Sequence, residues 1–413
     1  MPPLIPLLFL SLFLFFSFNT AFSAEEFDDP QTKKLVEVLH TGNNDKKAYS
    51  ASALSEKGDP QAIPHLIQEL NTRNNYLRAY IVKALWDFGE PAVPQLIEAV
   101  KSEKTLVRAN SADALGKIGN KVAIDPLISL LKDKKRYVRK NAILALGYYD
   151  EPKVMKALIS AYPNEKNSKN KSSILRRLGG YKNKAVIPVL IEGVQTFGSN
   201  RHVFIRRDAA TALGELGFLE GVQPLLSALA DPDEEIQDVA RSGLVKIGQA
   251  NGEAVPLIIA GLKVEELLIR ANAAKALGEI GDPRAVGALI PLLKDIPDEG
   301  AGQTVVLNAV NALALLKDKQ AVDALLPLLG SLNTPVRLST VEALGVIGDR
   351  KAIPGIIPLV FDFHVMVRTR AITVLGDFGA KDAVSALEKV AQKDKKERLR
   401  ELAKKTIDII QQL

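Results

Sequence analysis

The segment ALGEIGDPRAV, residues 276–286, contains two glycines three positions apart, followed by an Asp-Pro pair. Glycines ahead of a helix can bind phosphate through the unpaired N–H groups of the first helical turn. The two standard phosphate-binding patterns, G-x-G-x-x-G and G-x-x-x-x-G-K-[ST], are absent from this segment. A structural role explains the same residues: Gly278 would let two helices approach closely, and Gly281 would end a helix. The Asp-Pro pair would then cap and begin the next helix.

Similar segments recur along the chain, which favours the structural role. They begin at Ala84 (ALWDFGEPAV), Ala114 (ALGKIGNKVAI), Ala212 (ALGELGFLEGV), Ala343 (ALGVIGDRKAI) and Val374 (VLGDFGAKDAV). Most follow a Val-Arg or similar pair, and the spacings between neighbouring arginines include 30 residues, from Arg78 to Arg108, and 31, from Arg108 to Arg139. A repeat of this length is typical of two-helix units that stack into a solenoid.

Residues 90–119 show how one repeat is expected to fold. Val93, Leu96, Ile97 and Val100 form one apolar stripe with helical spacing. A polar turn follows, then a second apolar helix that Gly119 ends. Because neither helix can bury its stripe alone, neighbouring repeats must stack. The period predicts an all-α chain of about twelve two-helix repeats over residues 27–413, read as one continuous domain.

The repeat resembles the HEAT repeat, and in particular the short HEAT-like class also found in phycobilisome lyases. The resemblance rests on an apolar first helix that often begins near a proline, a D-x5-R spacing, and the pattern A-x2-A-L-G-x-I-G. It implies a right-handed α-α superhelix, an α-solenoid of the armadillo type. It also implies a ladder of hydrogen bonds and ion pairs between repeats, in which the Val-Arg arginines are structural. Asp133 with Arg139 and Asp362 with Arg368 match the spacing, whereas Asp231 is followed by Gln237.

Catalytic patterns are absent from the sequence. Deoxyhypusine hydroxylase, an enzyme of the same repeat class, holds iron through His-Glu pairs, and this chain contains no His-Glu dipeptide. Its four histidines, His40, His65, His202 and His364, fall in four repeats and are not expected to meet. Neither H-E-x-x-H nor G-x-S-x-G occurs. We therefore expect a non-catalytic protein without a metal or another cofactor.

The first residues indicate export. An apolar run from Leu4 to Phe18 precedes small residues, so residues 1–23 are predicted to be a secretory signal peptide; the alternative is an uncleaved membrane anchor. In either case, the rest of the chain is predicted to lie outside the cytoplasm, as a periplasmic, secreted or membrane-anchored protein. The chain has no cysteine, so packing alone must hold it together.

Asparagine recurs at one position of the second helix, two residues after the Val-Arg arginine or its equivalent. The asparagines are Asn110, Asn141, Asn272 and Asn308, and Tyr80 holds the same position. An amide side chain has two donors and an acceptor, so a row of them on the concave face would bind the backbone of an extended peptide. Armadillo arrays, which are similar in architecture, bind peptides with such a row. The alternative is that these amides bond each other or neighbouring helix caps.

Basic residues gather in the irregular centre, near residues 164–207. The candidate ligands there are Lys169, Lys171, Arg176, Arg177 and Arg201. They would meet an acidic protein, an anionic polymer or an anionic lipid, and the alternative is a solvated loop. The net charge of +6 arises from 54 basic and 48 acidic residues, so it does not predict a nucleic-acid partner.

Aromatic residues form a third group, which includes Tyr76, Tyr80 and Trp86. Trp86 stands where other repeats have glycine, and we expect it to fill core rather than to anchor an interface.

Together these features predict an exported, non-catalytic scaffold that binds a partner protein on the concave face of a solenoid. Two alternatives stay open. One is a protein that binds an anionic surface polymer or lipid through the basic loops. The other is a lyase-like or enzyme-accessory protein that presents a small molecule in the groove.

Overall fold

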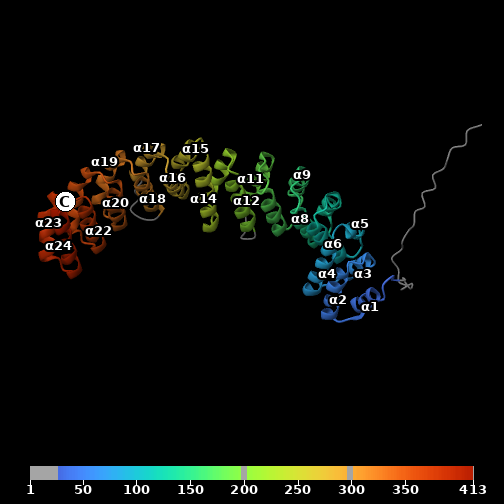
Figure 1. Ribbon diagram of the computed structural model, residues 1–413. Coiled ribbons are helices and arrows are strands. Elements are labelled where there is room, and N and C mark those ends of the chain that lie inside the picture. Colours follow the sequence, from blue (N-terminus) through green and yellow to red (C-terminus); the bar gives the residue numbers. More distant parts are fainter. Residues whose placement is uncertain (1–26, 197–201, 295–300, 413) are drawn as a thin grey trace, which may run out of the picture. The chain divides into compact units, whose positions relative to one another are not determined.

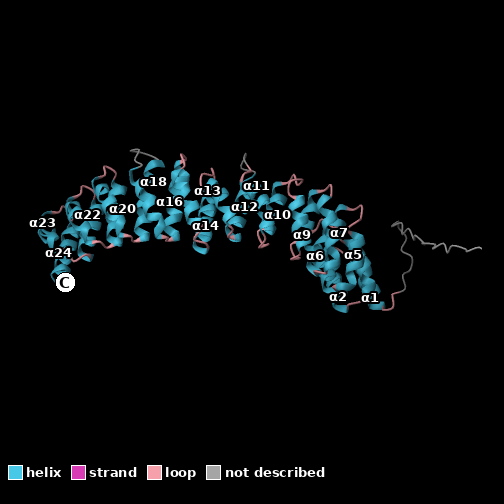
Figure 2. Ribbon diagram, turned by 90° about the horizontal axis from the view of Figure 1, so that it is seen from above, coloured by secondary structure: helices cyan, strands magenta, loops and turns pink. Residues whose placement is uncertain are grey.

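The computed structural model describes residues 27–196, 202–294 and 301–412, so the proposed signal peptide lies outside the described residues. Within these ranges the regular secondary structure is entirely helical (Figure 2). The chain forms 24 α-helices there, which make twelve consecutive pairs. The predicted all-α fold of about twelve two-helix repeats is therefore confirmed.

Each pair contributes a first and a second helix. The first helices are α1 (Pro30–Thr41), α3 (Ile63–Glu69), α5 (Val93–Ala99), α7 (Ile124–Ser129), α9 (Pro152–Ala161), α11 (Ile187–Val194), α13 (Val222–Ala228), α15 (Ala254–Ala260), α17 (Val286–Leu289), α19 (Val322–Leu325), α21 (Ile353–Ile356) and α23 (Val384–Lys393). The second helices are α2 (Asn44–Lys57), α4 (Asn75–Phe88), α6 (Thr105–Ile118), α8 (Arg136–Leu146), α10 (Ser168–Leu178), α12 (Val203–Leu216), α14 (Glu234–Ala250), α16 (Leu267–Ile280), α18 (Ala301–Leu316), α20 (Thr334–Ile347), α22 (Val365–Asp377) and α24 (Glu397–Gln412).

Short 3-10 helices lead into many of the first helices or follow them. They are η1 (Pro60–Ala62), η2 (Glu90–Ala92), η3 (Lys121–Ala123), η4 (Leu130–Lys132), η5 (Lys184–Val186), η7 (Leu219–Gly221), η8 (Gly261–Lys263), η9 (Pro283–Ala285), η10 (Ile290–Lys294), η11 (Lys319–Ala321), η12 (Leu326–Gly330), η13 (Arg350–Ala352), η14 (Ile357–Phe361) and η15 (Lys381–Ala383).

The helices form two compact units, divided between Asn120 and Lys121. In the N-terminal unit, α4 lies between α2 and α6 and contacts both. In the C-terminal unit, the second helices from α8 to α24 form a row in which each contacts the next (Figure 1). Stacking of neighbouring repeats is therefore confirmed within each unit. That residues 27–413 form one continuous domain stays a prediction.

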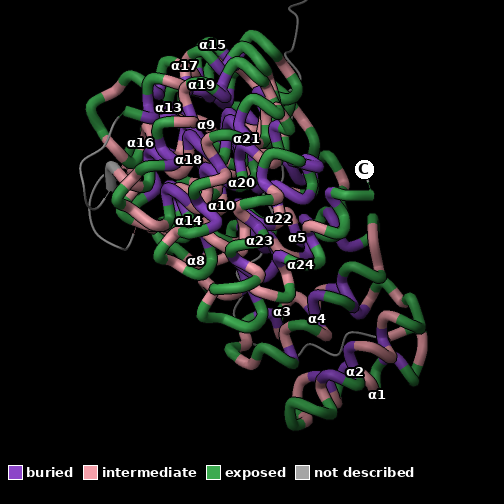
Figure 3. Tube along the Cα trace, turned by 90° about the vertical axis from the view of Figure 1, so that its left-hand side faces the viewer, coloured by how far each residue is buried: buried purple, intermediate pink, exposed green. Residues whose placement is uncertain are grey.

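The recurring leucine of the A-L-G pattern lies in the core. Leu85, Leu115, Leu277 and Leu344 are all 0% exposed, and buried and exposed segments alternate along the helices (Figure 3). Burial of one such side chain stabilises the fold by roughly 1.5–3 kcal/mol. Because the same position is buried in repeat after repeat, it holds the stack together along its length.

The turn between repeats has the structure that ALGEIGDPRAV predicts. Gly281 adopts a left-handed φ of 79°, and its N–H donates to Leu277 O at 3.2 Å. The Asp282 side chain accepts from Arg284 N at 2.9 Å, and Pro283 begins η9. At Gly278 an added Cβ would lie 2.6 Å from Ala312 Cα on the next second helix. The glycines and the Asp-Pro pair therefore have a structural role at the boundary between repeats.

The Val-Arg arginines form the ladder that the resemblance implies. Arg337 donates from Nη1 to Ser331 O at 2.8 Å, at the end of the first helix of its own repeat. Its Nε lies 2.7 Å from Asp362 Oδ2 in the next repeat. Arg368 repeats both contacts, with Asp362 O at 2.9 Å and with the Asp394 carboxylate at 2.8 Å. One guanidinium thus caps a helix end and joins two repeats.

This geometry refines the D-x5-R pairing. Within one repeat the arginine binds the backbone carbonyl of the aspartate, as Arg139 binds Asp133 O at 2.9 Å. The carboxylate is left for the arginine of the preceding repeat, as Asp231 accepts from Arg206 at 2.6 Å. Gln237 replaces the arginine after Asp231 and still donates to its carbonyl at 2.8 Å.

Repeat five replaces the ladder aspartate with Glu165. Its two carboxylate oxygens accept from Arg139 at 2.8 Å each, and one of them also accepts from Asn170 at 3.0 Å. Burial raises the pKa of the Glu165 carboxyl, but hydrogen bonds from Arg139, Asn170 and the Asn167 backbone outweigh it and lower the pKa to about 2. The carboxylate therefore stays ionised well into the acid range.

Gly278→Ala tests the close approach of α16 and α18. The added methyl would collide with backbone of the neighbouring helix, so we expect a loss of about 1–3 kcal/mol in the free energy of unfolding, measured by circular dichroism in urea. Gly287→Ala in α17 is the matched control, because an added Cβ there meets nothing within 4 Å. Equal stability of the two variants would show that α16 and α18 are not packed so closely.

Glu165→Gln tests the ladder through its pH dependence. Because folding lowers the pKa from the usual 4.5 to about 2, the stabilisation is present above pH 4.5 and is lost as the pH falls toward 2. We expect the urea midpoint of the variant to lie below that of the wild-type protein at neutral pH. The two midpoints should converge as the pH falls through this window, and a difference that stays constant would contradict the assignment.

Candidate binding surfaces

The asparagine row makes contacts between repeats. Asn110 is 0% exposed, and its Nδ2 donates to Leu70 O at 2.7 Å. Asn272 donates to Leu229 O and Asn308 to Ala271 O, both at 2.9 Å. Leu70 and Leu229 are the C-cap residues of α3 and α13, so these amides bond neighbouring caps.

The remaining members of the row are half-buried. Asn141 lies on α8 and also has an interaction partner, and Tyr80 packs against Tyr76 on α4. The structure thus supplies a structural role for Asn110, Asn272 and Asn308, and peptide binding by the row stays a prediction. Sequence spacing could not show this, because the acceptors lie about one repeat away.

Some of the central basic residues are paired with carboxylates. Arg176 lies 2.9 Å from Asp208, and Arg207 lies 3.1 Å from Glu235. Lys184 reaches Glu220 at 2.6 Å. Part of the positive charge that the sequence concentrates here is therefore neutralised locally.

The other predicted basic ligands differ in their surroundings. Lys171 lies over the Tyr162 ring, with Nζ 4.4 Å from the ring centroid, and Lys169 is exposed on α10. The Arg177 guanidinium lies against Gly147 of the preceding repeat. Arg201 falls outside the described residues.

Aromatic side chains lie wholly or partly at the surface of α2 and α4 in the N-terminal unit. They are Tyr49, Tyr76, Tyr80 and Trp86, and we call this set the aromatic face. Tyr49 is 72% exposed and Trp86 is 49% exposed. The rings of Tyr76 and Tyr80 are 4.8 Å apart, and the interaction with Tyr80, with a smaller effect of Asp45, raises the pKa of Tyr76. Tyr76 therefore keeps its hydroxyl proton at physiological pH and presents both its ring and its hydroxyl group.

The expectation that Trp86 fills core is wrong. Equivalent positions in other repeats hold Gly214 and Gly278, where an added Cβ would meet backbone of the next helix at 2.5 and 2.6 Å. Where neighbouring helices pack this closely, the position has no room for a side chain, so it cannot bury the indole ring of Trp86. The ring lies at the surface instead.

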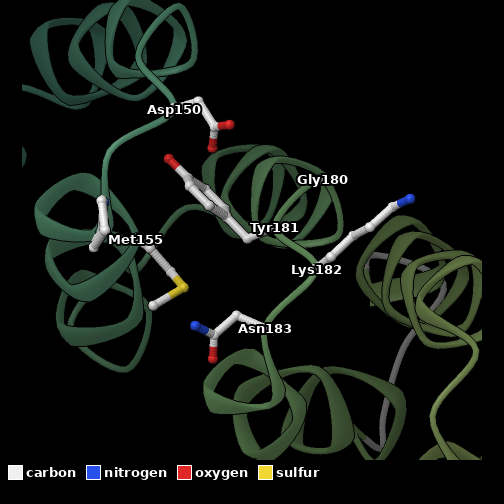
Figure 4. A pocket seen from close by; sticks show the side chains of 7 residues that line it. Asp150, Met155, Gly180, Tyr181, Lys182 and Asn183 are labelled. Carbon is white, nitrogen blue, oxygen red and sulfur yellow. The ribbon is translucent and has the colours of Figure 1, made fainter.

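A pocket of about 510 Å³ lies at the turns that follow α8 and α10 (Figure 4). Its lining residues are Asp150, Pro152, Met155, Gly180, Tyr181, Lys182 and Asn183. Burial raises the pKa of Tyr181, whose hydroxyl donates to Tyr149 O at 3.0 Å, and the Lys182 side chain points away from Tyr181 and Met155. The pocket offers apolar surface and a few hydrogen-bonding groups.

The sequence explains why a pocket forms here. Asp150 and Lys182 stand where other repeats have the left-handed glycines, such as Gly119. Helices α8 and α10 end after 11 residues, whereas α6 and α16 have 14. Two adjacent repeats thus lose the last turn of the second helix, and the wider connection leaves space between them.

Two histidines meet, which contradicts the expectation that none would. His40 Nε2 lies 3.0 Å from His65 Nδ1, and His40 Nδ1 lies 3.0 Å from Glu69 Oε1. Stacking brings residues of adjacent repeats side by side, which local spacing within one helix cannot reveal. Across the described ranges, no three His, Asp or Glu side chains are placed to hold a metal ion.

None of the helices in the described part of the chain combines the length and the apolar character that crossing a membrane requires.

Family models match most of the chain. The model described as HEAT repeats matches residues 63–146, 124–197, 222–307 and 329–408. The model described as PBS lyase HEAT-like repeat matches residues 46–72, 205–231 and 305–331.

Two known proteins illustrate the likeness. The alpha subunit of phycocyanobilin lyase from Picosynechococcus sp. is 35% identical over 101 residues, which is 22% of this chain and 37% of that protein. A crystal structure of importin beta superposes with a TM-score of 0.61 at 15% identity, covering 93% of this chain and 66% of importin beta. The chain thus spans less than two thirds of either relative. By the extent of the family match and the stacked helix pairs, this chain belongs to the HEAT-repeat family and is an α-solenoid.

Proposed function

We propose that the protein is an exported, non-catalytic scaffold that binds a partner protein through the aromatic face on α2 and α4. The observation that supports this most is the exposure of Tyr49, Tyr76 and Trp86 in one N-terminal unit. The second helices carry this face, as the sequence predicts for the partner site. HEAT solenoids are typical protein-binding scaffolds, and their stacked repeats present extended surfaces.

The composition of the face suits a protein interface. Tyrosine and tryptophan are enriched at binding hot spots because they bury a large area at a small cost in side-chain entropy. An ion pair between Lys83 and Asp87, 2.6 Å long, lies on the same helix and would supply a polar rim. Exposed parts of these rings are not stabilised by burial in the fold, and burial against a partner would account for them.

Export is proposed from the apolar run and the small residues within residues 1–23. N-terminal sequencing of the chain recovered from the extracytoplasmic fraction is expected to begin at Ala24. A chain that remains in the cytoplasm would contradict this part of the proposal.

A second candidate function is presentation of a small molecule. It is supported by the pocket at Tyr181 and by the likeness to phycocyanobilin lyase over 101 residues. A visible absorption band in the purified protein, or a shift in the absorption band of added phycocyanobilin together with its co-elution with the protein, would favour it. Binding of an anionic polymer receives less support, because Arg176 and Arg207 already have carboxylate partners.

The double variant Tyr49→Ser/Tyr76→Ser tests the aromatic face. The chain is immobilised and incubated with the envelope fraction of its own cells, and retained proteins are identified by mass spectrometry. We expect the variant to bind the main partner at least about tenfold more weakly, because exposed aromatic anchors carry much of an interface's affinity. The free energy of unfolding should change by less than about 1 kcal/mol, since both side chains are exposed.

Tyr148→Ser is the matched control, because Tyr148 is also exposed but lies in the turn after α8. Equal retention by the double variant and the wild-type protein would exclude the aromatic face as the interface. If the wild-type protein retains no protein partner, the scaffold function itself fails.

A further inference from the structure

Large apolar side chains project from two neighbouring turns in the C-terminal unit. The turns connect η12 to α20 and η14 to α22. We call their exposed side chains the apolar ridge and define it by Leu332, Phe361, Phe363, Val365 and Met366. Leu332 is 94% exposed and Phe363 is 77% exposed.

Other repeats carry charged residues at the same turn positions. Phe361 lies seven residues before the ladder arginine, where other repeats have Lys132, Lys263 and Lys393. Leu332 and Phe363 lie five residues before it, where other repeats have Lys134, Glu265 and Lys395. The turn therefore folds without an apolar residue at either position. Leu332 and Phe363 are mostly exposed and gain little from burial, so burial in the fold does not explain their apolar character.

A buried arginine joins the two turns into one surface. Arg337 is 4% exposed, and its Nη1 donates to Leu332 O at 3.2 Å. Its guanidinium carbon lies 4.5 Å from the centroid of the Phe363 ring. The same guanidinium pairs with Asp362, which lies between the two phenylalanines. The Leu332 backbone and the Phe363 ring are thus held in place before any partner arrives, which favours binding.

The ridge has a positively charged neighbour on one side. The equivalent turn of the last repeat exposes Lys393, Lys395, Lys396 and Arg398, with Glu397 as the exposed acid. Asp394 is the acidic residue of this turn on the side of the ridge. It forms an ion pair with Arg368 at 2.8 Å, which neutralises its charge. Polarity therefore changes along the row of turns, from apolar in repeats ten and eleven to basic in repeat twelve.

We propose that the apolar ridge is a second docking surface, and that its occupant is a segment of a partner protein with apolar side chains beside acidic residues. The apolar side chains cover Leu332, Phe361 and Phe363, and the acidic residues face Lys395 and Lys396. The inference rests on the proposed scaffold function but uses a different unit of the chain from the aromatic face.

The arrangement of charge favours a peptide over a membrane surface. A loop that inserts into anionic lipid is best served by basic residues around its apolar tip, so that both meet the surface together. Here the basic residues lie one repeat farther along the row. A linear segment that is apolar at one end and acidic at the other matches this order.

Selection from a displayed library of short random peptides on the full chain tests the proposal. We expect the enriched peptides to combine two or more large apolar residues with a cluster of Asp and Glu. Phe361→Lys/Phe363→Lys should lower the affinity for the selected peptides at least about tenfold. Each substitution installs the residue that repeat four has at the same position, so folding should be retained, as the thermal midpoint will show.

One further variant separates the contribution of the basic residues from that of the apolar ridge, and a second serves as a control. Lys395→Glu/Lys396→Glu should remove the preference for acidic residues while the apolar preference remains. Leu315→Lys, an exposed apolar residue near the far end of α18, is the matched control and should change nothing.

Three results would overturn the inference. They are enrichment without acidic residues, selected peptides that bind the folded Phe361→Lys/Phe363→Lys variant equally well, and ridge-dependent binding to phosphatidylserine vesicles in place of peptides. None of these alters the capture result for Tyr49→Ser/Tyr76→Ser, so failure of the ridge and failure of the proposed function are distinguishable.

Discussion

A pair of helices about 30 residues long cannot bury its own apolar stripes, and the rest of this structure depends on that constraint. Each repeat offers leucines such as Leu115 and Leu277 that are buried only when neighbours stack. Stacking along one direction then forces every helix to leave one side in water. A protein built in this way has a large surface relative to its core, and that surface is available for binding.

Polar contacts set how one repeat meets the next. The ladder arginines cap the first helix of their own repeat and pair with an acid of the following one, as Arg337 does with Ser331 and Asp362. Buried charges are costly unless they are paired and hydrogen-bonded, so this arrangement admits few alternative registers. Asn110 acts in the same way, through the end of a first helix. The asparagines that the sequence suggests as a peptide-binding row thus already use some of their hydrogen-bonding groups in contacts between repeats.

Departures from the repeat pattern are where function is to be sought. Trp86 replaces a packing glycine and lies at the surface, and Phe361 and Phe363 stand where other repeats have lysine or glutamate. The missing left-handed glycine at Asp150 opens a pocket. In a regular array each position can be compared with its equivalents, so an exposed apolar side chain or a lost helical turn marks a place to test for a role other than folding.

The sequence by itself determined the helix pairs, their approximate number and the turn that ends a repeat, because these depend on local periodicity and capping chemistry. Gly281 and Asp282 have the conformations that their residue types favour. Only the tertiary structure decided which residues meet across repeats. The contact between His40 and His65, the acceptor of Asn110 and the exposure of Trp86 all depend on the register between stacked helices. That register is set by packing of whole faces, and no spacing within a single helix encodes it.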